Sequence, residues 1–238
     1  MTGAGNGMGE ATTKLFAEEG ATVYGVDIKS DALKKWEDNP NVIPVVADLL
    51  DNDDIENLFN LVKEREGKLD ILANIAGIND LCYPLLDTTE ERWDMVIDLD
   101  LKVPFLLSQK AVEMMLPKES GVISVGSYAA YRGNHGPSYS AAKHGLMGLT
   151  SSVAAGYADK GICCNAINPG GVNTNIAENS GGEYHEEGVK RLGMATGNVP
   201  VPYGEPIEIA RAALWLSVDE AHHINGALVP VDAGLSAF

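Results

Sequence analysis

The sequence predicts an α/β fold in which helices cover both faces of a doubly wound parallel sheet. Short runs rich in Val, Ile and Ala recur along the chain, and longer amphipathic stretches separate them. Strands buried on both faces of a parallel sheet read as continuous apolar runs, and helices usually connect them. The alternation therefore predicts three layers: helix, sheet and helix.

The positions of the elements follow from the same pattern. The runs expected to form strands are 22–26, 42–47, 71–75, 121–125, 163–167 and 227–231. The stretches expected to form helices are 8–19, 29–37, 51–66, 90–115, 138–158 and 206–216. Asp51 and the sequence Thr88-Thr89-Glu90-Glu91 carry the side chains that favour helix starts. The segment 176–203, rich in Gly, Glu, Asn and Pro, is expected to be a mobile substrate loop.

Length and composition predict a single domain, residues 1–238, with 45% hydrophobic residues to fill its core. The formal net charge of −17 opposes binding to nucleic acid or to anionic membranes. Because the chain has no long apolar run and no basic leader, we expect a soluble cytoplasmic protein. Cys82, Cys163 and Cys164 lack metal-ligand spacing and are expected to be reduced core thiols.

Tyr139 and Lys143 lie four residues apart in the predicted helix 138–158 and therefore share one face. A tyrosine hydroxyl, with a reference pKa of about 10, becomes a usable acid or base when a fixed cation stabilises its phenolate. Tyr139 can then exchange a proton with a substrate hydroxyl or carbonyl. Tyr and Lys also meet at this spacing by chance, so the pair needs support from the rest of the chain.

That support comes from a glycine-rich segment and an acid. Gly3, Gly7 and Gly9 allow a tight turn and the close approach of a pyrophosphate to backbone N–H groups. Asp27 ends the next predicted strand, where a carboxylate accepts hydrogen bonds from the adenosine ribose and repels the 2′-phosphate of NADP. The segment predicts NAD as cofactor, although Lys29 could soften the discrimination. The alternative is that Asp27 is a solvated residue of the turn.

The glycine turn should follow a central strand, yet only Met1 precedes Thr2. An empty strand position would leave two neighbouring strands without a partner. We expect that the first strand is missing because this chain is shorter than the natural protein. The alternatives are that another segment fills the position or that the fold is compromised.

These motifs resemble those of the short-chain dehydrogenase/reductase family, in its single-domain form with a Rossmann-like fold. The resemblance covers nearly the whole chain and includes the glycine turn from Thr2 to Gly9, the Tyr139 to Lys143 motif and Asn74-Ile75-Ala76-Gly77. It implies that Asp48 contacts the adenine amino group and that Thr174, after Pro169 and Gly170, binds the nicotinamide carboxamide. The cofactor-binding residues that it implies are Gly3, Asn6, Gly7, Met8, Gly9, Asp27, Asp48, Leu49, Asn74, Ala76, Gly77, Tyr139, Lys143, Pro169, Gly170, Val172 and Thr174.

The resemblance also implies two further catalytic residues. Ser127, twelve residues before Tyr139, matches the serine that holds the reacting oxygen, with Ser124 as a competing candidate. Asp100 stands where the family usually has an asparagine that seats a proton-relay water. A carboxylate there adds a negative charge near Tyr139 and Lys143, so we expect weaker acid-base catalysis or a more alkaline optimum.

The sequence therefore predicts an NAD-dependent oxidoreductase that interconverts a secondary alcohol and a ketone, with Tyr139, Ser127, Lys143 and Asp100 as catalytic residues. Its expected partners are a small-molecule substrate and further copies of itself, as a tetramer or dimer. The rival hypothesis is a noncatalytic or impaired NAD-binding relative with a binding or regulatory role, which the missing strand and Asp100 favour. Five histidines lack an acid or metal spacing and are expected to have packing or surface roles.

Overall fold

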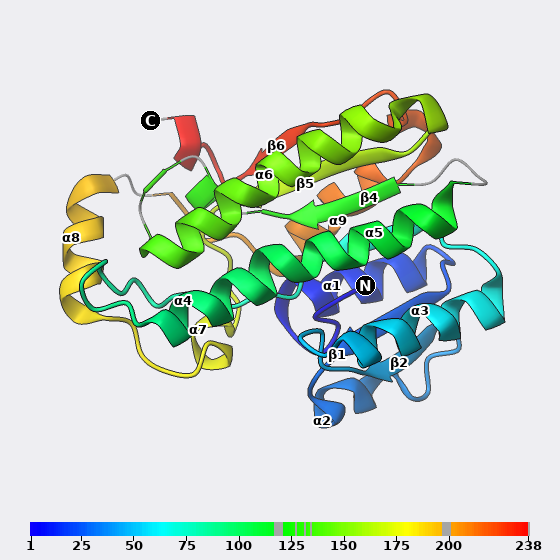
Figure 1. Cartoon of the computed structure of the whole chain (residues 1–238), viewed down its shortest axis with the longest axis horizontal. Helices are drawn as coiled ribbons and strands as arrows, with labels where there is room; N and C mark the ends of the chain where they lie inside the picture. The colour runs from blue at the N-terminus through cyan, green and yellow to red at the C-terminus, as the bar shows by residue number, and fades with distance from the viewer. Residues whose placement is uncertain (117–120, 127, 131, 134, 197–200, 238) are drawn as a thin grey trace.

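Parallel strands form the sheet of the computed structural model, which describes residues 1–116, 121–126, 128–130, 132–133, 135–196 and 201–237 (Figure 1). The strands are β1 (Val23–Asp27), β2 (Val42–Val46), β3 (Ile71–Asn74), β4 (Gly121–Val125), β5 (Cys163–Pro169) and β6 (Leu228–Val231). They match the six predicted strands to within about two residues at each end. Apolar runs alone were sufficient here because burial on both sheet faces demands them.

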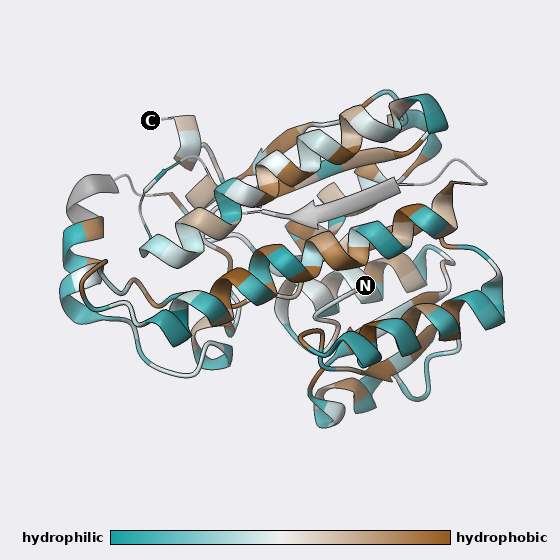
Figure 2. Cartoon of the chain, viewed as in Figure 1, coloured by the Kyte–Doolittle hydropathy of each residue, from teal (hydrophilic) through white to brown (hydrophobic). Residues whose placement is uncertain are grey.

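Helices cover the two faces of the sheet and confirm the three-layer α/β fold. On one face, α1 (Gly7–Glu18) packs against α9 (Pro206–Leu216), and together they cover β1, β5 and β6. On the other face lie α3 (Asn52–Glu66), α5 (Val103–Met115) and α6 (Pro137–Tyr157). Figure 2 shows hydrophilic residues along α3 and mainly hydrophobic ones on the strands behind it. No helix in the described part of the chain is long and apolar enough to traverse a bilayer.

The sheet is divided between β1 and β3, where the sequence predicts a missing first strand. Strands β1 and β2 form one ladder, and β3, β4, β5 and β6 form the other. Met1 and Thr2 lie between the two: Val26 N donates to Met1 O at 2.9 Å, and Thr2 N donates to Ala73 O at 3.1 Å. These two residues join the ladders at the carboxyl ends of the strands, next to the glycine turn. That a longer strand belongs in this position stays a prediction.

Two helical regions differ from the sequence-based expectation. The predicted helix 90–115 is divided into α4 (Glu90–Ile97), a π-helical segment (Asp98–Lys102) and α5. Such a segment widens the helix by one residue and is frequent at functional sites. The predicted loop 176–203 contains α7 (Ile176–Asn179) and α8 (Glu186–Thr196). The expectation of a loop over the whole segment was wrong, because an amphipathic stretch that forms α8 lies between its Gly-rich and Pro-rich ends.

The smaller elements follow the local sequence. The predicted helix 29–37 is a short α2 (Ser30–Leu33) followed by a 3₁₀ turn (Lys34–Trp36). Asp51 caps α3 by accepting a hydrogen bond from Asp53 N at 2.8 Å, and Thr89 caps α4 by accepting one from Arg92 N at 3.2 Å. Both predicted helix starts are thereby confirmed.

Candidate active site

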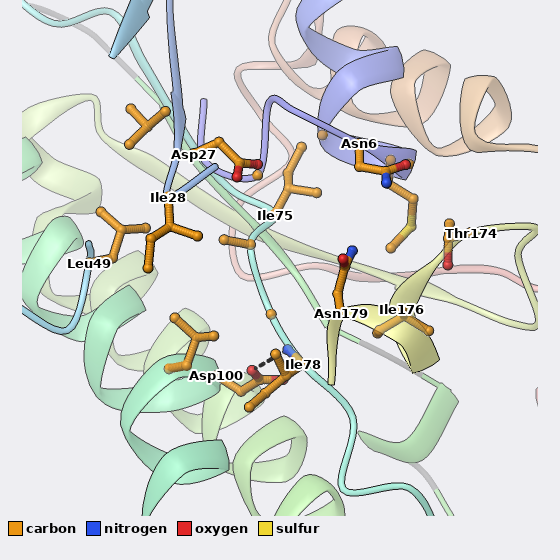
Figure 3. Close-up of a pocket in the computed structure, with 18 of the residues that line it drawn as sticks. Asn6, Asp27, Ile28, Leu49, Ile75, Ile78, Asp100, Thr174, Ile176 and Asn179 are labelled. Atoms are coloured by element: carbon orange, nitrogen blue, oxygen red, sulfur yellow. Dashed lines mark hydrogen bonds between the residues drawn. The ribbon is translucent and has the colours of Figure 1, made fainter. Parts of the chain in front are cut away.

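A cavity opens where the strands end, and its wall is formed by segments that follow strands, by the glycine turn and by residues of the helical segments that carry Asp100 and Tyr139 (Figure 3). This is the edge at which open α/β sheets bind their ligands. Most of the predicted site residues line it: Gly3, Asn6, Gly7, Met8, Gly9, Asp27, Asp48, Leu49, Ala76, Gly77, Asp100, Tyr139, Lys143 and Thr174. The fold therefore gathers residues that are up to about 170 positions apart in the sequence.

The glycine turn is held against the segment after β3 by one hydroxyl group. Thr2 Oγ1 accepts hydrogen bonds from Ile75 N at 2.9 Å and from Ala76 N at 3.0 Å. A Cβ atom on Gly9 would lie 2.0 Å from the carbonyl oxygen of Gly3, so α1 can begin this close to the turn only with glycine there. Gly3 itself has a φ of 72°, in the left-handed region that favours glycine.

These features fit a pyrophosphate. The Asn6 side chain makes no hydrogen bond that caps α1, which leaves the first N–H groups of the helix to be satisfied from the cavity side. The positive end of the helix dipole adds attraction for an anion. The residues present therefore fit the phosphates of a dinucleotide at this end of the cavity.

Asp27 lies at the rim of the cavity and also supports the glycine turn. Its Oδ2 accepts a hydrogen bond from Gly5 N at 3.0 Å, and its Oδ1 accepts one from Lys29 N at 3.0 Å. The carboxylate is thus fixed in orientation, with lone pairs left for ribose hydroxyls. The role as a turn residue and the predicted role toward the ribose are therefore compatible.

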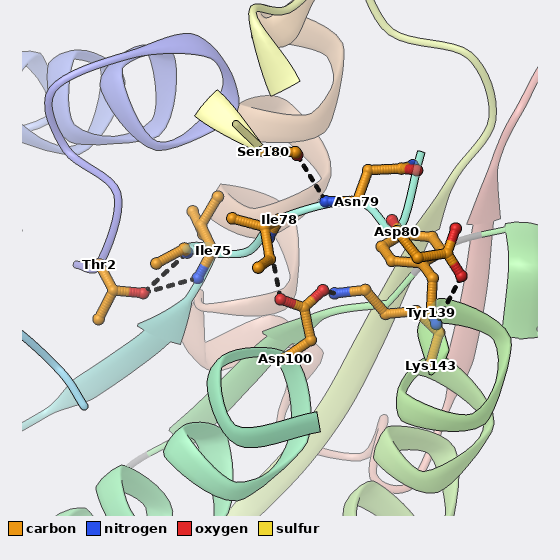
Figure 4. A network of polar contacts seen from close by, with 10 residues as sticks. Thr2, Ile75, Ile78, Asn79, Asp80, Asp100, Tyr139, Lys143 and Ser180 are labelled. Atoms are coloured by element: carbon orange, nitrogen blue, oxygen red, sulfur yellow. Dashed lines mark hydrogen bonds and ion pairs between the residues drawn. The ribbon is translucent and has the colours of Figure 1, made fainter. Parts of the chain in front are cut away.

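The opposite end of the cavity holds Tyr139, Lys143 and Asp100 (Figure 4). Tyr139 and Lys143 share one face of α6, as predicted, and the Lys143 Nζ lies 5.3 Å from the centre of the Tyr139 ring. Lys143 Nζ lies 3.0 Å from Asp100 Oδ2, and the two side chains are 7% and 0% exposed. This contact is an ion pair without well-aligned hydrogen-bond geometry at Oδ2. Asp100 Oδ1 accepts a hydrogen bond from Ile78 N at 2.9 Å.

Burial and neighbouring charges shift the pKa values of both Asp100 and Lys143. Burial raises the pKa of Asp100, and the neighbouring Lys143 cation and Ile78 N–H offset only part of that effect. Burial by itself opposes the charge on Lys143, but Asp100 and Tyr139 outweigh it, so the pKa of Lys143 lies above its ordinary value. Lys143 therefore keeps its proton, and its ammonium group lies against the Asp100 carboxyl.

Some predicted site residues lie outside the cavity wall. Asn74 is buried, and its Nδ2 donates to Ser108 Oγ at 3.5 Å, which directs the amide toward α5 and away from the cavity. The cofactor contact of Asn74 that the resemblance implies stays a prediction. Pro169, Gly170 and Val172 stand at the end of β5 and are not part of the wall that the described residues form. Ser127 lies outside the described residues.

Several wall residues carry no motif and were not predicted. Ile28, Ile78 and Ile176 are apolar residues of the wall (Figure 3), and Leu50 is a fourth. Lys29 reaches α7 from the other side of the cavity, where its Nζ donates to Asn179 Oδ1 at 2.7 Å. Isolated apolar side chains and a contact across 150 positions leave no signal in a single sequence.

The remaining candidates have no place in the cavity. All three cysteines are free, and burial raises the pKa of Cys82 to about 11 and that of Cys164 to about 12, so both thiols stay protonated. His135 is packed against Tyr139 with ring centres 5.0 Å apart, and burial lowers the pKa of its imidazole. Its packing role is as predicted, with the added feature that its neighbour is Tyr139.

The fold and the cavity define a dinucleotide-binding α/β protein of the oxidoreductase class. Residues 3–236 match the family model described as enoyl-(acyl carrier protein) reductase. The chain is 34% identical over 242 residues to the 3-oxoacyl-(acyl-carrier-protein) reductase FabG of Thermotoga maritima, covering 99% of this chain and 96% of that protein. It is 34% identical over 248 residues to the levodione reductase of Leifsonia aquatica, covering 100% of this chain and 93% of that protein.

Solved structures agree with these relatives. The crystal structure of levodione reductase superposes with a TM-score of 0.87 at 35% identity, over 99% of this chain and 96% of that one. 4-Hydroxyisoleucine dehydrogenase complexed with NADH and succinate superposes with a TM-score of 0.86 at 27% identity, over 100% and 99% of the two chains. The chain belongs to the short-chain dehydrogenase/reductase family, as its motifs indicated. It is thus an oxidoreductase of a family that uses nicotinamide cofactors.

Proposed function

We propose that this protein is an NAD-dependent enzyme that interconverts a secondary alcohol and a ketone. The observation that carries the proposal is the position of Tyr139 and Lys143 in one cavity with the glycine turn and Asp27. A proton-transfer pair at one end and a nucleotide cradle at the other are what hydride transfer to or from a carbonyl carbon requires. A protein that only bound the dinucleotide would not need Tyr139.

Each catalytic side chain has a distinct task in this proposal. Held by the glycine turn, Asp27 and Lys143, the bound cofactor would supply the hydride acceptor for oxidation of the alcohol and the hydride donor for reduction of the ketone. Tyr139 Oη takes the proton of the alcohol in oxidation and gives it back in reduction. Lys143 stabilises the phenolate form of Tyr139 by its charge and binds the ribose hydroxyls next to the nicotinamide. Ser127 is expected to orient the reacting oxygen.

Asp100 replaces the usual asparagine and acts on the same proton path. Its ion pair with Lys143 neutralises part of the charge that favours the phenolate of Tyr139, which supports the proposal of an alkaline optimum for oxidation. The same ion pair is the observation in favour of the rival hypothesis, a dinucleotide-binding relative with impaired catalysis. The two hypotheses differ in whether any turnover depends on Tyr139.

The preference for NAD over NADP depends on the rim around Asp27. A fixed carboxylate there repels a 2′-phosphate, and the side chain of Lys29, two residues further on, already donates to Asn179 on α7. Lys29 would have to leave this contact to neutralise a phosphate. The rim therefore favours the unphosphorylated ribose.

The substrate class stays broad. In the segment 176–203, four glutamates outnumber Lys190 and Arg191, and Arg191 Nε is held by Glu187 Oε1 at 2.9 Å. That balance disfavours polyanionic substrates and leaves steroids, polyols, small diketones and cyclic alcohols as candidates. Segment 176–203 is proposed to contact the substrate within one domain that spans residues 1–238.

We also propose that the protein acts as a homo-oligomer, a tetramer or dimer. Trp93 and Met95 on α4 and Phe105 on α5 are large apolar side chains that are 37%, 40% and 46% exposed. Large apolar side chains that stay exposed on consecutive helical segments are suited to a contact with a second copy. Light scattering of the purified chain measures the oligomeric state directly.

The decisive experiment is a panel of these alcohols and ketones, assayed by nicotinamide absorbance with NAD and NADP in parallel. The proposal expects turnover with at least one member, faster with NAD, and abolished in Tyr139→Phe. Turnover that survives in Tyr139→Phe would contradict the mechanism. Tight NADH binding without turnover on any member would favour the noncatalytic rival.

A further inference from the structure

Asp80 is a buried carboxylate that belongs to none of the motifs discussed above. Its residue is 0% exposed, and its two oxygens are satisfied by four hydrogen-bond donors. Oδ1 accepts from Cys82 N at 3.1 Å and from Gly136 N at 3.1 Å. Oδ2 accepts from Tyr139 N at 2.9 Å and from Ser138 Oγ at 3.4 Å. A buried carboxylate satisfied by backbone N–H groups fixes the position of the chain that donates them.

Three of the four donors belong to the beginning of α6, the helix that carries Tyr139 and Lys143. Figure 4 shows the contact of Asp80 with Tyr139. In most helices the residue before the first turn accepts the N–H of the third helical residue with its own side chain. That N–H is the one of Tyr139, and the residue in the capping position is Gly136, which has no side chain. A Cβ atom on Gly136 would lie 2.5 Å from Asp80 Oδ2. Asp80, 59 positions earlier in the sequence, therefore accepts the hydrogen bond that a capping side chain at position 136 would accept. It also occupies the space that such a side chain would need.

The turn that carries Asp80, residues 79–82, is itself held in an unusual conformation. Leu81 and Cys82 have φ values of 57° and 60°, which non-glycine residues rarely adopt. Asn79 Oδ1 accepts from Leu81 N at 2.7 Å, and Asp80 accepts from Cys82 N as described. Strained residues persist where the surrounding structure holds them in place. This turn is therefore a defined support and not a variable loop.

The same turn also supports the segment that contains α7 and α8. Asn79 N donates to Ser180 Oγ at 2.8 Å, and His185 N donates to Leu81 O at 2.8 Å. A Cβ atom on Gly188 would lie 1.8 Å from the carbonyl oxygen of Cys82, so α8 lies directly on the turn. Tyr184 stands in the sequence between these contacts, and its pKa is raised by burial and by the nearby Cys82 group.

We propose that Asp80 is a positioning residue for Tyr139, which fastens the first turn of α6 to the turn 79–82 on which the segment 176–196 also rests. The phenol and the segment expected to contact the substrate then share one support, so their separation is set by Asp80 and not by the helix alone. This inference rests on the proposed function for its kinetic consequence. The shared support itself does not depend on that function.

The test compares Asp80→Ala with the double variant Asp80→Ala, Gly136→Ser. Removing the Asp80 side chain clears two of the three close contacts that a Cβ atom at position 136 would make. The third, the Tyr83 carbonyl oxygen at 2.7 Å, has to shift before the serine hydroxyl can accept the Tyr139 N–H as an ordinary helix cap. We expect Asp80→Ala to lose about tenfold or more in kcat, because small displacements of a catalytic group have effects of this size. The dissociation constant of NADH should change by less than about threefold, because Asp80 does not line the cavity. The double variant should recover melting temperature but not kcat.

Amide hydrogen exchange gives a readout that needs no substrate. Asp80→Ala should accelerate exchange in both the first turn of α6 and residues 181–188, and the double variant should restore only the helix. Asp80→Asn, which keeps the shape and one acceptor oxygen, should show the same changes to a smaller extent and serves if the alanine variant does not fold. Asp51→Ala is the matched control, because it removes a carboxylate cap from α3 without touching the turn 79–82.

Several outcomes would overturn the inference. Full recovery of kcat in the double variant would show that only a helix cap is needed. Unchanged kcat in Asp80→Ala, or faster exchange confined to α6, would contradict the inference that α6 and the segment 176–196 share one support. A kcat loss of similar size in Asp51→Ala would show a general effect of helix destabilisation. If the wild-type chain turns over no substrate, the proposed function fails while the exchange experiment still decides on the support.

Discussion

Asp100→Asn is the substitution that most directly tests how this site handles protons. Asp100 Oδ2 lies 3.0 Å from Lys143 Nζ, which lies 5.3 Å from the centre of the Tyr139 ring, so the carboxylate is at most about 8 Å from that ring. At an effective dielectric constant of about 20, two charges about 8 Å apart interact by about 2 kcal/mol. That energy corresponds to about 1.5 pKa units.

The sign of the effect follows from which form of Tyr139 acts. In oxidation the phenolate accepts the proton, so the rate rises with pH as Tyr139 ionises. The negative charge of Asp100 opposes the ionisation of Tyr139. It also neutralises the Lys143 cation, whose charge favours that ionisation. Removing the charge should therefore move the rising limb of the oxidation profile to lower pH by about 1.5 units and raise the rate near neutral pH.

The assay is kcat for alcohol oxidation as a function of pH, measured below the melting temperature of each variant, since breaking a buried ion pair can cost on the order of 3–5 kcal/mol. Asp98→Asn is the matched control, because it removes the same charge from the same π-helical segment. Its partner is Lys102, at 3.1 Å, outside the cavity. A limb that stays in place in Asp100→Asn would refute the reasoning. A sharp loss of activity would show that the carboxylate itself relays protons.

Three further predictions concern the cofactor, the tyrosine and the first strand. NADH should bind at least about tenfold more tightly than NADPH in fluorescence titrations, and Asp27→Ala should narrow that gap, because the carboxylate repels the 2′-phosphate; equal constants in the wild-type chain would count against this. Tyr139→Phe should lose nearly all turnover and still bind NADH. Lys143→Ala should lower both the turnover, measured by steady-state kinetics, and the affinity for NADH, measured by titration. Adding an apolar strand of about six to eight residues before Thr2 should raise the melting temperature and NADH affinity, because it would pair with β1 and β3; no gain on either measure would show that Met1 and Thr2 suffice.

The strands of the sheet, the glycine turn and Asp27 could be predicted from the sequence because their signals are local. Strands buried on both faces need apolar runs, and the position of Asp27 at the end of one such run follows from counting along the chain. The common face of Tyr139 and Lys143 follows from helix periodicity. Family motifs extended this reasoning to Thr174 and Asp48, which also lie on the cavity.

Other parts of the site were decided by contacts between distant residues. The ion pair of Asp100 with Lys143, the capping of α6 by Asp80 and the contact of Lys29 with Asn179 join positions 43, 59 and 150 residues apart. The amide of Asn74 faces α5 for the same kind of reason, because its partner Ser108 is 34 positions away. Local periodicity sets which face of a helix or strand a side chain occupies. Which buried polar groups meet depends on how the elements pack, because each buried donor or acceptor must find its partner within the assembled fold.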